Sequence, residues 1–359
     1  MLLDCNQILH YDISEFNWYT FWLLKVQEKY PKVDNLELVH LVLSPSEIFD
    51  LLEYCADVCR SQEFQHLATQ YYKSLFGHLE QEWMIQRVFN VRINTPDCES
   101  LGKLVQFHTD GWTGNGDGIT TVWTPITESY DSNSLWVLDN EKSLMLSEQI
   151  ILNKWDYDRI QEEAVLLSEP LTLSPGECYA FSSKTIHGCI KNVTGKSRWS
   201  MDGRILVKGK NYHRKTPGGY FRDPDNFDGQ REIPINSNWA IYAGWSSKFS
   251  YNLPALMQRQ YILSYAKKID INIVSNGIYE NEGFDWFPSL KKSFEMKSLD
   301  GIFMLSILCL PDNANLRHEI LKHALNKNKQ IYFVNEEFLF KNQIDLEYID
   351  KIFGYVSET

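Results

Sequence analysis

The chain has 359 residues, of which 43% are hydrophobic and 23% charged, and its formal net charge is −12 with a pI of about 5.3. The length favours two domains, the acidic balance argues against nucleic-acid binding, and the absence of any run of about 18 apolar residues argues against a membrane span. The N-terminus lacks the basic-then-apolar pattern of a signal peptide. Seven scattered cysteines without a CxxC pair indicate reduced thiols in a cytoplasmic protein.

The N-terminal part of the chain is predicted to be mainly helical. Ser44 and Glu47 have the spacing of a capping box, with a proline directly after the serine. Apolar residues then recur at helical spacing. Cys55 and Cys59 belong to this pattern; their separation could suit a metal, but buried packing explains it better. A second helix is expected over residues 64–79.

From about residue 83 to residue 207, short stretches rich in β-branched and aromatic residues alternate with turn residues. Such a pattern is typical of an antiparallel sandwich or barrel, and we expect a jelly roll here. The predicted strands lie in RVFNVRI, KLVQFHTD, ITTVWTPI, SLWVLD, PLTLSPGECYAF, HGCIKNVT and RWSMDGRILV. The expected fold class is therefore mixed, with N-terminal helices and a jelly roll followed by a smaller domain.

The tripeptide from His108 to Asp110 is the strongest local signal of chemistry. Side chains two apart on a strand point to the same face, so His108 and Asp110 can converge on one metal ion. His187, which follows a predicted turn, strand and turn, is the candidate third ligand. Two imidazoles and one carboxylate on one side of a metal suit a non-haem iron(II) oxygenase. The alternative is a core histidine and a turn aspartate, because such tripeptides also arise by chance.

Other residues near this motif are candidates for binding the co-substrate or the substrate. Arg198 follows His187 at the start of another predicted strand, where a guanidinium could hold a carboxylate through two hydrogen bonds. Ser200 lies on the same face and could add a hydroxyl. Gln106 shares a face with His108, and Arg92 could meet an anionic or hydroxylated substrate. Trp112 flanks the motif as a further substrate contact, and for these last three an ordinary structural role is an equal alternative.

With these residues, the segment from about residue 87 to residue 207 resembles the phytanoyl-CoA-hydroxylase-like 2-oxoglutarate/iron(II) dioxygenases. It is most similar to the branch typified by the streptomycin-biosynthesis protein StrG. The similar stretches are RVFNVRI, VQFHTDGWTGNGDG, TVWTPIT, NSLWVLD, LSPGECYAFSSKTIHG and KSRWSMDGRI. Where many relatives have Pro-Gly-Ser-His, in a region that often borders the substrate, this chain has Leu138-Asp139-Asn140-Glu141.

The resemblance implies a double-stranded β-helix and a set of site residues. His108, Asp110 and His187 match the family's iron ligands, so Fe(II), 2-oxoglutarate and O2 are the implied cofactor and co-substrates. Arg198 matches the arginine that binds the distal carboxylate of 2-oxoglutarate, and Ser200 would assist it. The resemblance covers about a third of the chain.

A segment dense in Gly, Pro, Asp and Asn predicts a domain boundary. We expect an oxygenase domain over residues 1–210, a linker or active-site lid over 211–237 and a second domain over 238–359. In the last range predicted strands alternate with predicted helices, which indicates a small α/β domain with a parallel sheet. Residues 239–340 resemble the sporadic carbohydrate cluster protein, and we interpret this part as a recognition or assembly domain.

Three hypotheses for function follow. The first is an oxygenase that oxidises a small molecule or glycan related to carbohydrates, in polysaccharide or sugar-derived metabolite biosynthesis, without a nucleic-acid or membrane partner. The second is a non-redox, cupin-like epimerase or isomerase of sugar nucleotides. The third is a binding or scaffold protein with a vestigial metal site. Arg198 and the aspartate of the motif favour the first, and whether several copies assemble stays open.

Overall fold

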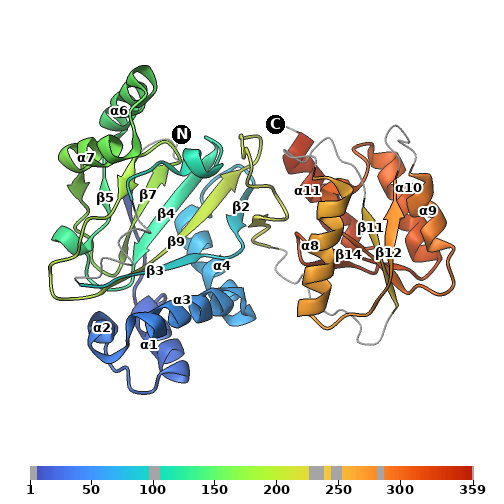
Figure 1. The fold of residues 1–359 in the computed structure, drawn as a ribbon, viewed down its shortest axis with the longest axis horizontal. Coiled ribbons are helices and arrows are strands. Elements are labelled where there is room, and N and C mark those ends of the chain that lie inside the picture. The colour runs from blue at the N-terminus through green and yellow to red at the C-terminus, as the bar shows by residue number, and fades with distance from the viewer. Residues whose placement is uncertain (1–5, 97–105, 226–237, 244–252, 281–286, 358–359) are drawn as a thin grey trace. The chain divides into compact units, whose positions relative to one another are not determined.

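The computed structural model describes residues 6–96, 106–225, 238–243, 253–280 and 287–357. The chain divides into two compact units, Met1–Lys215 and Thr216–Thr359. Figure 1 shows the first unit in blue to green-yellow and the second in yellow to red. Each unit combines helices with a β-sheet, so the mixed fold class is confirmed.

Helix α3 begins where the capping box predicts, and the helix expected over residues 64–79 runs from Gln62 to Phe76. The Ser44 hydroxyl accepts from the Glu47 N–H, and the Glu47 carboxylate accepts from the Ser44 N–H at 2.8 Å, which confirms the capping box. Cys55 and Cys59 are buried free thiols, so their packing role is confirmed, whereas Cys5 and Cys98 lie outside the described residues. The helices are α1 (Trp18–Lys29), α2 (Val39–Val42), α3 (Pro45–Arg60) and α4 (Gln62–Phe76).

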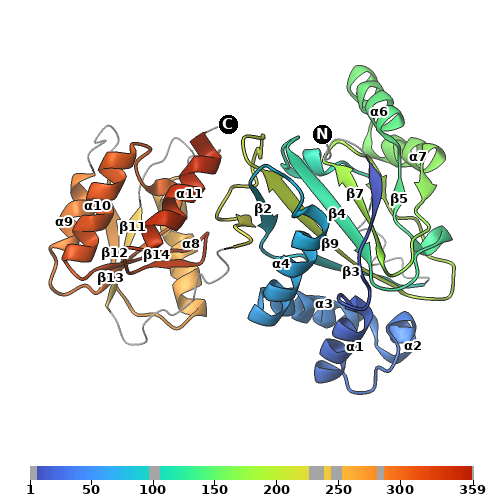
Figure 2. The ribbon, with the colours of Figure 1, turned by 180° about the vertical axis from the view of Figure 1, so that it is seen from behind.

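An antiparallel sheet forms the centre of the first unit. Its strands pair in the order β1-β7-β4-β9-β2, and β3 also pairs with β9. Helices α3 and α4 lie across one face of this sheet (Figure 2). The strands are β1 (Gln7–His10), β2 (Trp83–Gln86), β3 (Asn90–Asn94), β4 (Ile119–Pro125), β7 (Glu177–Ser182) and β9 (Arg198–Val207).

Strand β9 has two chemically different faces. Trp199, Met201 and Ile205 are buried in the apolar core that the sheet shares with the N-terminal helices. Because side chains alternate along a strand, the even-numbered residues point the other way. These are Arg198, Ser200, Asp202, Arg204 and Leu206, all of them buried, and all but Leu206 are polar or charged. Buried charges need partners, so this second face forms the wall of a polar interior.

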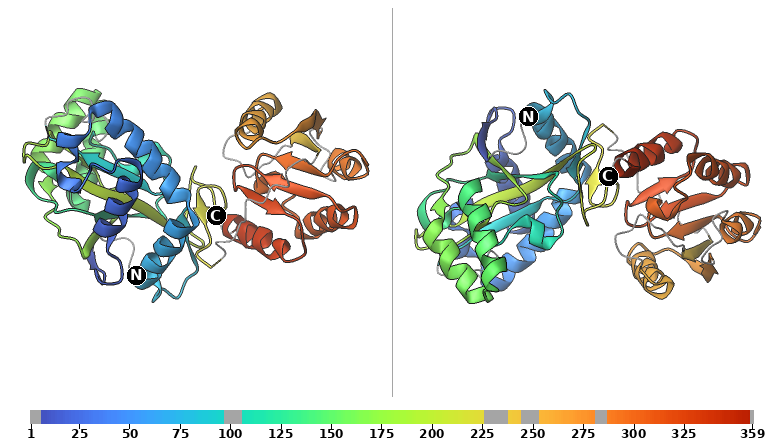
Figure 3. Two further views of the ribbon diagram at one scale, coloured as in Figure 1. Left: turned by 90° about the horizontal axis from the view of Figure 1, so that it is seen from below. Right: turned by 90° about the horizontal axis from the view of Figure 1, so that it is seen from above.

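A smaller antiparallel sheet pairs in the order β6-β5-β8, with β5 (Trp136–Val137), β6 (Glu169–Pro170) and β8 (His187–Gly188). His108 extends this sheet, because its N–H donates to the His187 carbonyl and its carbonyl accepts from the His187 N–H, both at 3.0 Å. Between β5 and β6 the chain forms α6 (Asn140–Asn153) and α7 (Tyr157–Leu167). In Figure 1 these two helices lie at the top of the unit and α1 to α3 at the bottom, and in Figure 3 the blue helices are in front in the view from below and the green ones in the view from above.

The second unit has the sheet order β12-β11-β13-β14-β15, in which only the pairing of β14 with β15 is antiparallel. Strands and helices alternate along the chain, as the sequence predicts. The apolar stretch GIFMLSILCL is a strand only over its first part, β13, because Ser306 then caps a short 3-10 helix, η5 (Ile307–Cys309), through its side chain. The elements are β10 (Phe221–Arg222), β11 (Trp239–Ala243), α8 (Ala255–Lys268), β12 (Ile273–Tyr279), α9 (Pro288–Phe294), β13 (Gly301–Met304), α10 (Ala314–Asn326), β14 (Gln330–Phe333), β15 (Phe338–Phe340) and α11 (Asp345–Ser357).

Among the described residues, no helix is both long and apolar enough to cross a membrane.

Candidate active site

Three of the predicted residues converge as a group with the spacing of metal ligands. One ligand atom each from His108, Asp110 and His187 lies within 4.8 Å of the other two, and Asp110 and His187 are buried. The predicted strand through the motif needs a correction. The backbone is extended at Thr109, so the alternation holds there, but at Asp110 the chain turns into a 3-10 helix, η3 (Asp110–Thr113). We call these three residues the His-Asp-His cluster.

Backbone carbonyls orient both imidazole rings of the cluster. His108 Nδ1 lies 2.7 Å from the Gln106 carbonyl oxygen, and His187 Nδ1 lies 3.0 Å from the Thr185 carbonyl oxygen. A carbonyl only accepts, so each Nδ1 carries the proton and each Nε2 keeps a lone pair for a metal. Burial, together with the neighbouring His108 ring, lowers the pKa of His187 to about 4, so this ring is neutral at neutral pH.

The third member, Asp110, is held by a buried arginine. Arg204 donates from Nη2 to Oδ1 at 2.8 Å and from Nε to Oδ2 at 3.1 Å, and the Thr121 hydroxyl also donates to Oδ2. Burial by itself would raise the pKa of Asp110, but the charge of Arg204 and these hydrogen bonds hold it well below its usual range. Oδ1 has one donor and so keeps a lone pair for a cation. The donor set therefore fits a divalent metal such as iron.

Arg204 is in turn fixed by further side chains. Its Nη1 donates to Gln86 at 3.0 Å and to Asp202 at 3.2 Å, and Asn90 donates to the same oxygen of Asp202 at 2.7 Å. We did not predict Arg204, Thr121 or Asp202 as site residues. The signal was present in the sequence, since the alternation that selects Arg198 and Ser200 continues through Asp202 and Arg204.

Arg198 is a buried cation whose polar contacts are neutral groups. Only 2% of it is exposed. Its Nε donates to the Asn133 carbonyl at 2.9 Å, Nη1 to the Ser200 hydroxyl at 2.5 Å and Nη2 to Cys189 Sγ at 3.3 Å, and its guanidinium lies 5.4 Å from the Trp123 ring centre. No carboxylate of the described residues pairs with it. A buried charge without a counter-ion is costly, so this guanidinium is suited to an anionic ligand.

One cavity of about 260 Å³ connects these groups. It is lined by the His-Asp-His cluster and Arg198, together with Arg92, Asp202 and Arg204. Trp123, Leu135 and Phe181 supply apolar wall. The cavity thus brings the His-Asp-His cluster and Arg198, which has no carboxylate partner among the described residues, to the same enclosed space.

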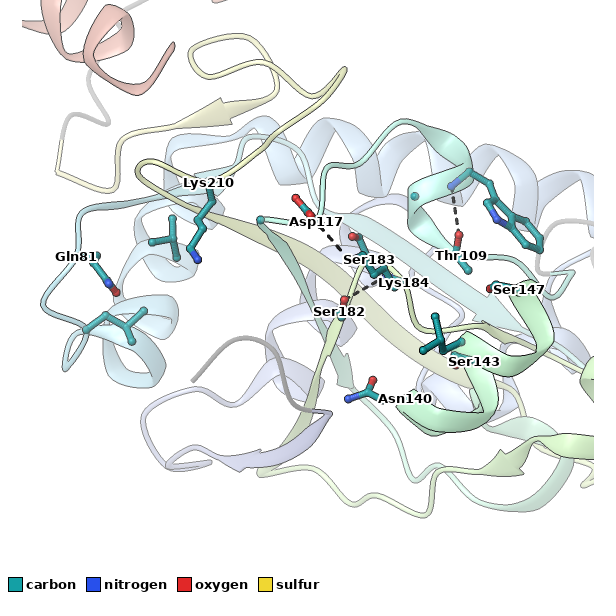
Figure 4. A pocket seen from close by; sticks show the side chains of 16 residues that line it. Gln81, Thr109, Asp117, Asn140, Ser143, Ser147, Ser182, Ser183, Lys184 and Lys210 are labelled. Carbon is teal, nitrogen blue, oxygen red and sulfur yellow. Dashed lines mark hydrogen bonds and ion pairs between the residues drawn. The ribbon is translucent and has the colours of Figure 1, made fainter. Parts of the chain in front are cut away.

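Two predicted contacts lie elsewhere. The residue Gln106 is exposed and outside the cavity lining, and its contribution is the backbone carbonyl that orients His108. Trp112 is 48% exposed and lines a second cavity of about 680 Å³ instead. Figure 4 shows this second cavity, with Thr109 beside the turn of η3 and Ser143 and Ser147 on α6. Trp112 lies in η3 and lines this second cavity and not the smaller one, and the binding roles expected of Gln106 and Trp112 stay predictions.

Comparisons with known proteins give structural neighbours at low similarity. No protein-family model matches the chain, and the search of curated proteins found no match. ThoJ, a non-heme monooxygenase solved with Ni, shares 14% identity over 57% of this chain and 74% of its own, with a TM-score of 0.35. SnoN, a non-heme alpha ketoglutarate dependent epimerase from nogalamycin biosynthesis, shares 11% identity over 59% and 82%, with a TM-score of 0.34. SnoN has also been solved with Fe3+, alpha ketoglutarate and nogalamycin RO.

The N-terminal catalytic domain of TP901-1 integrase is a third neighbour, with 15% identity over 32% of this chain and 90% of that domain and a TM-score of 0.26. Because these identities and TM-scores are low, the function proposed below depends on the geometry of the site.

Proposed function

We propose that the chain is an Fe(II)- and 2-oxoglutarate-dependent dioxygenase, similar to the phytanoyl-CoA-hydroxylase-like enzymes, that hydroxylates or otherwise oxidises a carbohydrate-related small molecule. The observation that carries the proposal is the pairing of two features in one cavity. The His-Asp-His cluster offers metal ligands, and Arg198 is a buried cation without a carboxylate partner among the described residues. A dicarboxylic keto acid can satisfy both, because one end chelates a metal and the other end is an anion.

The strand order supports a double-stranded β-helix. The chain passes from β4 in the larger sheet to β5 and β6 in the smaller one. It then returns to β7 in the larger sheet, enters β8 in the smaller one and ends in β9 of the larger one. His108 pairs with β8 and so adds a further segment to the smaller sheet. In such a fold the space between the sheets is where the cluster and the polar face of β9 would meet.

Each residue has a definite role in this proposal. His108, Asp110 and His187 would hold Fe(II) on one side and leave the other coordination positions open. Bound iron and 2-oxoglutarate, with dioxygen, supply the oxidising chemistry. Arg198 binds the far carboxylate of the co-substrate through its fork of N–H donors. Ser200 accepts from Arg198 and keeps the guanidinium plane in place.

The apolar residues of the cavity exclude water from the reacting groups. Trp123 and Phe181 lie on neighbouring strands of the larger sheet, and Leu135 precedes β5. A drier cavity strengthens the attraction between Arg198 and a carboxylate, because the local dielectric is lower than that of water. The same walls leave limited volume, so a larger substrate would place only its reacting part inside.

The test is an anaerobic titration of the full chain with Fe(II) and 2-oxoglutarate, followed by the visible metal-to-ligand charge-transfer band. We expect the band in the wild type and its loss in His108→Ala and Arg198→Ala. Arg60→Ala is the matched control, because Arg60 lies on α3, pairs with Asp57 and is outside the cavity lining.

The outcomes separate the competing hypotheses. A band that depends on both residues, with succinate formed from 2-oxoglutarate in air, supports the oxygenase. Metal binding without any band or keto-acid consumption contradicts it and favours the non-redox epimerase. Absence of metal binding favours the scaffold hypothesis.

A further inference from the structure

Arg92 is the most exposed charged residue of the cavity lining that does not bind the metal in our proposal. Its side chain is 42% exposed, whereas that of Arg204 is 8% exposed. It lies on β3 opposite Ser200 of β9, so it belongs to the same polar face as Arg198. Arg92 is therefore the charged lining residue that solvent reaches most readily, whereas Asp110 and His187 of the cluster are buried.

The contacts of Arg92 leave most of its donors available. Within the described residues its one polar partner is Asp202, 3.5 Å from Nε. Asp202 is held more closely by Asn90 at 2.7 Å and by Arg204 at 3.2 Å. Asp202 is therefore a distant counter-ion that Arg92 shares with Arg204. The two terminal nitrogens of Arg92 have no acceptor among the described residues.

The charged residues that line the cavity also favour an anion near Arg92. Three arginines and two aspartates line it, which leaves one positive charge in excess. A divalent metal and a doubly charged keto acid cancel each other, so loading the site with both leaves that excess unchanged. The net charge of the whole protein is −12, so the excess of positive charge in this cavity is a local property of the site and would attract an anion there.

We infer that the substrate carries an anionic oxygen group, a phosphate or a carboxylate, which Arg92 binds while the bond to be oxidised lies at the metal. The inference rests on the proposed function and adds the substrate class to it. A guanidinium fork matches both groups through paired hydrogen bonds. A phosphorylated sugar and a sugar acid would each satisfy this chemistry.

The experiment uses simple anions and does not require turnover. The full chain is loaded with a limiting amount of Mn(II) and saturating 2-oxoglutarate, so that Arg198 is occupied and the paramagnetic ion is bound. Inorganic phosphate is then titrated and followed by ³¹P relaxation, and acetate is titrated in a parallel series and followed by its methyl ¹H relaxation. An anion at Arg92 lies in the cavity that holds the metal, so its relaxation is accelerated in a saturable manner.

We expect saturable acceleration for at least one anion in the wild type. Arg92→Gln should weaken that binding about tenfold or more, because a charge-assisted hydrogen bond is lost, and Arg92→Lys should give an intermediate value. Arg60→Gln, a similarly exposed arginine on α3, should bind as the wild type does. A response to phosphate alone indicates a phosphorylated substrate, and a response to acetate alone indicates a carboxylate.

Two results overturn the inference. One is the absence of saturable acceleration with either anion in the wild type, and the other is equal binding in Arg92→Gln, which would mean that the anion sits on the metal. The charge-transfer band with Fe(II) and 2-oxoglutarate is recorded for the same preparations. Its absence in the wild type defeats the proposed function itself, so the two failures are distinguishable.

Discussion

Arg204 and Asp110 form a two-point ion pair beside the candidate metal ligands, with contacts of 2.8 Å and 3.1 Å. Both side chains are almost fully buried. The pair orients the Asp110 carboxylate and leaves one lone pair of Oδ1 for a metal. At the same time it places a positive charge next to a cation site. Arg204 is therefore a positioning residue that acts through Asp110.

Breaking this pair should destabilise the fold. For Arg204→Met we expect the free energy of unfolding of the metal-free protein to fall by about 3–5 kcal/mol, because an unpaired carboxylate stays buried. Urea denaturation at neutral pH measures the change. The double variant Asp110→Leu, Arg204→Met is the control, since removing both charges should recover much of the loss. Equal stability of wild type and Arg204→Met would show that the pair is not formed.

The variant Arg198→Lys tests whether 2-oxoglutarate binding needs the planar guanidinium of Arg198 or only its positive charge. Lysine keeps the positive charge but not the planar fork, so we expect the dissociation constant of 2-oxoglutarate to rise about tenfold or more. The affinity for the metal alone should stay unchanged, because Arg198 does not contact the His-Asp-His cluster. Titrating the charge-transfer band measures the first quantity, and Co(II) absorption measures the second. Loss of both together would indicate a general disruption of the site.

Trp123 and Trp112 supply a test variant and its control for 2-oxoglutarate binding. Trp123 lies under the Arg198 guanidinium and lines the small cavity, whereas Trp112 lines the larger one. Trp123→Leu should weaken 2-oxoglutarate binding about threefold to tenfold through the lost cation–π contact, and Trp112→Leu should leave it unchanged. Calorimetric titration of the iron-loaded protein under nitrogen gives both values. The reverse ranking would place Trp112, and not Trp123, at the co-substrate site.

The pH dependence of stability distinguishes a packed Cys55 thiol from a metal-bound Cys55 thiolate. Burial raises the pKa of the Cys55 thiol to about 12, whereas an unfolded thiol titrates near 8.5. A raised pKa means that its stabilising contribution is complete below about pH 8.5 and is lost as pH rises toward 12. Between pH 8 and pH 10 the wild type should lose about 2 kcal/mol more stability than Cys55→Ala. Urea unfolding at both pH values checks this, and a metal-bound thiolate would show no such difference.

Local physics made much of the first unit predictable. The capping box at Ser44 and Glu47 needs only neighbouring residues, so its prediction is confirmed. The alternation in β9 likewise depends on strand geometry alone, and it placed Arg198 and Ser200 on one face. The spacing of His108 and Asp110 predicted their convergence for the same reason, because Thr109 between them is extended.

The sequence by itself determined helices α3 and α4, several strands and the residues of the His-Asp-His cluster and Arg198, because each is encoded in short-range patterns. Helices α6 and α7, in a range where only strands were predicted, were missed. Only the tertiary structure decided which residues surround Asp110. Thr121 lies opposite Arg204 through the register of β4 and β9, and both then reach the carboxylate. It also decided that Trp112 lines the larger cavity and that Gln106 contributes its carbonyl. Strand register and chain turns depend on contacts between distant segments, which local patterns do not encode.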